Sequence, residues 1–259
     1  MLAVVVDELQ GDPKDLAQRA VEVLGGTAYD VRASLTVPGG GPAVLAVVAE
    51  PDRAQAYRAG LEARGIRAAV VSVRADRPDF DVRRFSLGPT SLEVEDREGR
   101  RRSVPYASVD VLIRASAVQT TVSTKTVRER KFNPVRSVLS GGLVNTSVKV
   151  TKKTQRDTDS DELLFLYTGG ALPLRLSERT LQYQGLGDAL QPSRMANFLY
   201  MAKAIVTGCP RARVDERLRR RSFQSQLLGR TLSPDDHLDF AVHLVAQSLQ
   251  RPLPSQPRL

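Results

Sequence analysis

The sequence is poor in several residue types on which protein chemistry and packing often depend. It contains one cysteine, no tryptophan, seven phenylalanines and six tyrosines among 259 residues. The single cysteine, Cys209, excludes an intrachain disulfide and fits a reducing cytoplasm, which is where we expect the protein. Because aromatic side chains are so few, the hydrophobic cores must be built mainly from Val, Leu, Ala and Ile.

Long hydrophobic runs are also absent. The longest, residues 43–49, is far shorter than the roughly 20 apolar residues that a membrane-spanning helix needs. The apolar run at residues 3–6 has no basic residue before it and is followed at once by Asp7 and Glu8, so no signal peptide is expected. Any contact with a membrane would therefore be peripheral.

No group of residues in the sequence indicates catalysis or metal binding. His237 and His243, the two histidines, are six positions apart on a predicted helix, so their directions differ by about 240° and they cannot bind one metal ion from the same face. Cys209 falls on an apolar helix face, which favours a buried hydrophobic role over a nucleophilic one. We predict a non-enzymatic protein without cofactor, metal or catalytic residues. An enzyme whose site lies between two domains is left as an alternative.

Positive charge, by contrast, is concentrated in one segment. Residues 100–156 hold 13 lysines and arginines against two acidic residues. Residues 1–99 hold 12 against 16, and residues 157–259 hold 13 against 11. The excess behind the net charge of +9 is therefore segmental, which indicates one basic surface that meets an acidic partner.

Residues 1–75 have the pattern of a small α/β unit. A first helix is expected behind Asp12, a good N-cap residue, and a second helix is expected from about Asp52. Apolar strands are expected before, between and after them, at residues 4–6, 42–48 and 66–73. The order of strand, helix, strand, helix and strand suggests a ferredoxin-like plait.

Beyond a charged linker at residues 76–81, the pattern changes to segments typical of strands. An acidic turn is expected at residues 157–162, where it would offset the neighbouring Lys152 and Lys153. The expected strands are at residues 82–87, 91–95, 103–106, 109–130, 144–151, 163–167 and 171–183.

One strong amphipathic helix should follow these strands. Ser193 is its predicted N-cap, and Gly208 and Pro210 terminate it. Its predicted buried face consists of Met195, Phe198, Leu199, Ala202, Ile205, Val206 and Cys209. An arginine-rich stretch at residues 211–221, a short last helix and a proline-rich end complete the chain.

Two parts of the sequence resemble known families. Residues 52–71, which end in ARGIRAAVV, resemble small bacterial plait domains of the GlnB type and their relatives. The phrases SLEVEDREGRRRSVPYASVDVL and TLQYQGLGDALQPSRMANF, within residues 80–210, resemble bacterial PH-like or GRAM-like domains. That resemblance implies a barrel of seven strands with a C-terminal helix in one open end.

We therefore predict an α+β protein with four segments. They are a ferredoxin-like α/β plait at residues 1–75, a linker at 76–81, a PH-like antiparallel β-barrel with a capping helix at 82–210, and a helical tail at 211–259. The barrel domain would carry an extended basic hairpin.

The candidate binding surface lies on that basic hairpin. We predict contacts with a partner through Lys125, Arg128, Arg130, Lys131, Lys149, Lys152, Lys153 and Arg156. If the two strands are antiparallel, the two groups of charges are expected at opposite ends of the hairpin. The predicted partner is an acidic protein or an anionic membrane surface, with nucleic acid as the alternative. The basic residues could also serve only to protect the strand edges from aggregation.

Overall fold

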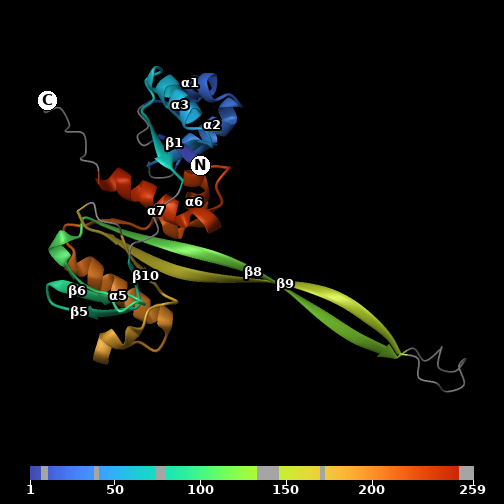
Figure 1. The fold of residues 1–259 in the computed structure, drawn as a ribbon, viewed down its shortest axis with the longest axis vertical. Helices are drawn as coiled ribbons and strands as arrows, with labels where there is room; N and C mark the ends of the chain where they lie inside the picture. The colour runs from blue at the N-terminus through green and yellow to red at the C-terminus, as the bar shows by residue number, and fades with distance from the viewer. Residues whose placement is uncertain (7–10, 38–40, 74–79, 133–145, 170–172, 251–259) are drawn as a thin grey trace, which may run out of the picture. The chain divides into compact units, whose positions relative to one another are not determined.

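A computed structural model of the chain shows a mixed α+β fold (Figure 1). It describes residues 1–6, 11–37, 41–73, 80–132, 146–169 and 173–250, and for residues 119–132 and 146–159 it describes the backbone alone. The chain forms two compact units, one of residues 1–117 with 161–259 and one of residues 118–160. The boundaries expected from the sequence at residues 75, 82 and 210 stay predictions.

The N-terminal part of the first unit is a three-stranded antiparallel sheet with helices on one face. The strand order is β2-β1-β3, so β1 lies in the centre. Val4 and Val6 of the central strand pack against Leu16, Ala20 and other apolar residues of the helices. The elements are β1 (Leu2–Val6), α1 (Pro13–Leu24), α2 (Ala28–Leu35), β2 (Ala43–Val48), α3 (Pro51–Glu62) and β3 (Ala68–Ser72).

The local signals placed most of these elements correctly. The Asp12 side chain accepts a hydrogen bond from the Lys14 amide and α1 begins at Pro13, as predicted. Helix α2 was not predicted, although Thr27 and Asp30 carry its signature. The Thr27 hydroxyl accepts a hydrogen bond from the Asp30 amide at 3.2 Å, as an N-cap side chain does, and donates to the Asp30 carboxylate at 2.8 Å.

The strands that follow form two further sheets. Five strands pair in the order β11-β8-β9-β10-β4, and three pair as an antiparallel meander, β5-β6-β7. No sheet closes into a barrel within the described residues, so the predicted closed barrel is not observed. The elements are β4 (Phe80–Val82), β5 (Arg84–Leu87), β6 (Ser91–Glu95), β7 (Arg101–Pro105), η1 (Tyr106–Ser108), β8 (Val111–Phe132), β9 (Thr146–Tyr167) and β10 (Leu174–Ser177).

Strand β9 runs without a break through residues 157–162, so the expected acidic turn is wrong. The acidic residues near its end accept hydrogen bonds from other residues of the protein. Asp161 accepts hydrogen bonds from the Ser177 hydroxyl at 2.7 Å and the Arg179 amide at 3.2 Å, and Glu162 accepts from two arginines. Because these carboxylates are paired, the backbone can continue as a strand where the sequence pattern indicated a turn.

Helices cover the five-stranded sheet on both faces. Along β8, Leu112 packs into a core with β5, β6, β7 and α5, whereas Ile113 packs into a core with β1, α6 and α7. The second core also reaches Ala3 and Val5, on the face of the small sheet away from α1–α3. The remaining elements are η2 (Tyr183–Ala189), α5 (Arg194–Gly208), β11 (Arg213–Asp215), η3 (Arg217–Arg219), α6 (Arg221–Leu228) and α7 (Pro234–Gln250).

Helix α5 is present where predicted, and most of its predicted face is buried, including Ala202, Ile205 and Cys209, although the buried face is shifted around the helix. Ser193 caps it, and Phe198 is fully buried as expected. Met195 and Leu199 were predicted to be buried and are 39% and 41% exposed. The helix is rotated by about 70° from the predicted orientation, because Asn197 turns inward. Its amide and carbonyl groups bond to the backbone of Gln191 and Ser193.

Candidate binding interface

All eight residues of the predicted binding surface fall in the second unit, residues 118–160. Four lie in strand β8 and four in strand β9, which are hydrogen-bonded neighbours. Their side chains lie outside the described residues. They are Lys125, Arg128, Arg130, Lys131, Lys149, Lys152, Lys153 and Arg156.

The bounds of the two strands decide whether the two groups of basic residues lie at the same end of the hairpin. The Asp110 amide, just before β8, donates to the carbonyl of Tyr167, the last residue of β9, so the strands run antiparallel. Both strands are 22 residues long. The end of β8 therefore lies beside the start of β9, which places residues 125–131 beside about residues 147–153, a stretch that includes Lys149, Lys152 and Lys153. The expectation that the two groups lie at opposite ends is wrong, because β9 is longer than the predicted strand.

The two units differ in net charge. Residues 118–160 contain nine lysines and arginines and three acidic residues, so they carry +6 of the net +9. The only aromatic residue among them is Phe132. We call this segment the basic ribbon.

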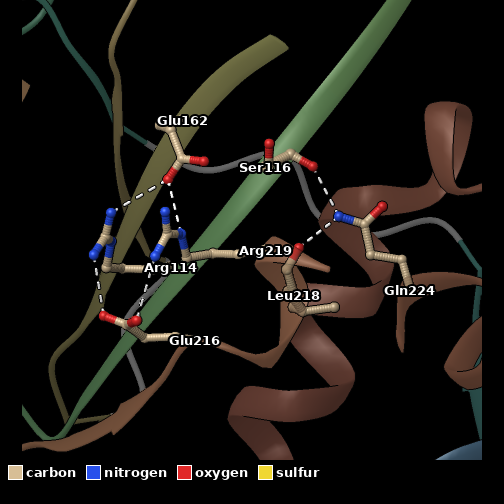
Figure 2. A network of polar contacts seen from close by, with 7 residues as sticks. All are labelled: Arg114, Ser116, Glu162, Glu216, Leu218, Arg219 and Gln224. Atoms are coloured by element: carbon tan, nitrogen blue, oxygen red, sulfur yellow. Dashed lines mark hydrogen bonds and ion pairs between the residues drawn. The ribbon is translucent and has the colours of Figure 1, made fainter. Parts of the chain in front are cut away.

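The first unit contains a cluster of four ionised side chains that the sequence analysis did not identify (Figure 2). Arg114 and Glu162 are each only 11% exposed, and an Arg114 Nη2 atom lies 3.3 Å from Glu162 Oε2. Arg114 also pairs with Glu216 at 3.1 Å, and Arg219 pairs with Glu162 at 3.1 Å and Glu216 at 3.5 Å. Positive and negative groups alternate, so the cluster has no net charge.

This cluster holds the segment after α5 against strands β8 and β9. Gln224 of α6 adds to it, since its side-chain amide donates to the carbonyls of Ser116 at 2.8 Å and Leu218 at 2.5 Å. The signal for the cluster was Arg114 itself, a charged residue within the apolar run VLIRAS. A charge in a buried strand requires a partner of opposite sign.

The arginines of residues 211–221 are largely committed to partners within the first unit. Arg213 donates to the carbonyl of Leu249, and Arg217 pairs with Asp215. Arg221 lies 2.7 Å from Asp235. The arginine-rich stretch therefore makes polar contacts that hold α7 and strand β11 in the first unit.

Neither histidine belongs to a metal site among the described residues, where no group of three or more potential ligands occurs. His237 Nδ1 lies 3.0 Å from the carbonyl of Ser233, and His243 lies beside Gln247. Cys209 is buried in the core beside α5, and burial raises the pKa of its thiol to about 11. At neutral pH the thiolate, which is the nucleophilic form, is almost absent.

We predict that Cys209 is nearly inert towards a disulfide reagent in the folded protein at about pH 8 and reacts at the rate of a free thiol in urea. Because folding raises this pKa, the unfolded state ionises first, and the free energy of unfolding should fall as the pH rises from about 9 to 11. The rate of colour release from the reagent measures the reactivity, and urea denaturation at several pH values measures the free energy of unfolding. Equal rates in the folded and unfolded protein would contradict the buried position.

No protein-family model matches the chain, and no curated protein or solved structure is significantly similar to it. The resemblances to plait and PH-like domains therefore stay predictions. No helix among the described residues has the length and apolar character needed to cross a membrane.

Proposed function

We propose that the chain is a non-enzymatic adaptor or regulatory binding protein of the cytoplasm. It would combine a ferredoxin-like part with a PH-like part and engage an acidic partner, a protein or an anionic lipid surface, through the basic ribbon. The observation that carries this proposal is the separation of charge. A segment of 43 residues holds two thirds of the excess positive charge, and eight of its nine basic residues lie on two adjacent strands.

Two features of the first unit support a non-enzymatic protein that binds its partner through the ribbon. Many arginines there pair with neighbouring carboxylates, as in the Arg114 cluster, and the first unit carries only +3 of the net +9, so most of the uncompensated charge is in the ribbon. The buried, weakly acidic thiol of Cys209 supports the absence of cysteine chemistry.

Nucleic acid is the alternative partner for the same surface, since phosphates also attract lysine and arginine. Recognition of single-stranded nucleic acid usually depends on aromatic side chains that stack on bases. The ribbon contains one aromatic residue, Phe132, which favours an acidic protein or lipid.

The test is to replace Lys125, Arg128, Lys149, Lys152 and Lys153 with Gln. We expect the variant to fold, because exposed charges contribute little to stability. Its binding to anionic vesicles, or its capture of an acidic protein, should drop sharply, and the binding of the parent protein should weaken between about 50 and 200 mM salt. Flotation with vesicles and pull-down with mass spectrometry measure the two outcomes.

A matched control removes the same number of charges from exposed positions of the first unit, with Gln at Lys14, Arg32, Arg97, Lys203 and Arg220. This control should keep its partner. Preferential binding to duplex DNA, lost only in the ribbon variant, would favour the nucleic-acid alternative. If the ribbon variant keeps every partner of the parent, the ribbon charge serves solubility alone and the proposal is wrong.

A further inference from the structure

Strand β2 is an edge strand with an unusually apolar sequence. It pairs with β1 on one side, and no described strand pairs with its other side. Its six residues read AVLAVV and include no charged residue or proline, which are the residues that commonly protect an exposed strand edge. Leu45 to Val48 are only partly buried. The free edge therefore presents extended backbone and apolar side chains together.

A groove with a volume of about 520 Å³ runs along this edge, within the size range of ligand sites. Its floor is residues 44–50, which include most of β2. One wall is the start of α2, with Thr27 and Asp30, and the other is the connection between α6 and α7, residues 228–231. Gly229 brings the second wall close to the strand. A Cβ atom there would lie 3.0 Å from the carbonyl oxygen of Val44, and its φ of +69° also favours glycine.

The groove lining holds two arginines and two carboxylates, and its arginines are the groups that can recognise an acidic occupant. Arg53 at the end of the groove bonds through Nε and Nη2 to the Tyr57 hydroxyl, at 3.1 and 3.0 Å, rather than to the neighbouring Glu50. Arg230 of the second wall pairs across the groove with Asp30 of the first wall, which Thr27 also holds. Arg230 is 80% exposed, so exchanging its partner for another carboxylate requires little free energy. Two guanidinium groups are thus placed to meet carboxylates that flank a bound strand.

We propose that this groove binds an extended apolar peptide segment of a partner protein, flanked by acidic residues, as a fourth strand paired with β2. The edge of β2 that no described strand pairs with supplies hydrogen bonds to an extended chain, once the exposed Arg230–Asp30 pair between the two walls opens. This site lies in the first unit and does not depend on the basic ribbon.

The experiment uses the full chain with the ribbon neutralised at its five positions, so that the ribbon cannot attract the probe. The probe is a fluorescent, end-blocked peptide EEVTVTVEE, followed by anisotropy. Replacing its central valine with proline removes a backbone donor and should weaken binding about tenfold. Hydrogen exchange of residues 43–50 should slow when the probe binds.

Charge specificity is tested with Arg53→Glu, an exposed change that should leave the fold intact. We expect binding of the glutamate-flanked probe to weaken about fivefold and binding of a lysine-flanked probe to improve. Lys14→Glu, an equal change of charge on α1 outside the groove, should have no effect.

Several results would overturn the inference. They are an absence of probe binding, equal binding of the proline peptide, and indifference to Arg53→Glu. Self-association of the chain that by itself protects residues 43–50 would show that a second copy occupies the edge. Binding that is present in the parent and lost when the ribbon is neutralised would place the peptide on the ribbon.

Discussion

Phe198→Asp is expected to lower the free energy of unfolding by about 4 kcal/mol or more, enough to unfold a marginally stable protein. Phe198 is fully buried in the core that α5 forms with the five-stranded sheet and the β5-β6-β7 meander. An aspartate there would be a buried charge without a partner. Urea denaturation followed by circular dichroism measures the loss.

Tyr200→Asp is the matched control, because it introduces the same side chain two positions along the same helix. Tyr200 is 44% exposed, so we expect a change within about 0.5 kcal/mol. Equal losses from the two substitutions would mean that the observed buried face of α5 is wrong.

The second large effect is expected at the buried ion cluster. Glu162→Gln keeps the size of the side chain but removes the charge that Arg114 and Arg219 share, and Arg114 is nearly buried. We expect a loss of about 3 kcal/mol in the free energy of unfolding, because a buried guanidinium loses its most buried counter-charge. Denaturation in urea at neutral pH measures it.

Glu216→Gln tests whether burial is the reason. Glu216 binds the same two arginines but is 49% exposed, so its loss should amount to less than about 1 kcal/mol. If the two substitutions destabilise the protein equally, solvent exposure does not govern the cluster, and the explanation given for Glu162 is wrong.

Elements with strong local signals could be predicted from the sequence. The N-cap Asp12 and the apolar stripe of Leu16 and Ala20 placed α1, and the run of apolar residues placed β2. Helix α6, like α2, was missed. It is eight residues long, its first position is an arginine, and its N-cap position, Arg220, makes no side-chain capping bond. Its stability comes from packing Leu227 and Leu228 into a core, which is tertiary information.

The errors at polar positions share a physical cause. Asp161 and Glu162 read as a turn because carboxylates are usually solvated, but partners distant in sequence satisfy them within a strand. Asn197 was not part of the predicted buried face of α5, and its bonds to the backbone of Gln191 and Ser193 allow it to be buried, which rotates the helix. The groove along β2 could not be foreseen either, because its walls come from residues about 200 positions apart.

The position of α6 and α7 has a consequence for synthesis of the chain. These helices come last in the described chain and cover the face of the β2-β1-β3 sheet that carries Ala3 and Val5. The sheet is complete once Ser72 has been made, yet that face has no cover until α7 ends at Gln250. At 5–20 residues per second this interval is roughly 10 to 35 seconds. During that time the nascent chain exposes an apolar sheet face together with an unprotected edge, which makes this period of translation the one in which a chaperone would matter most.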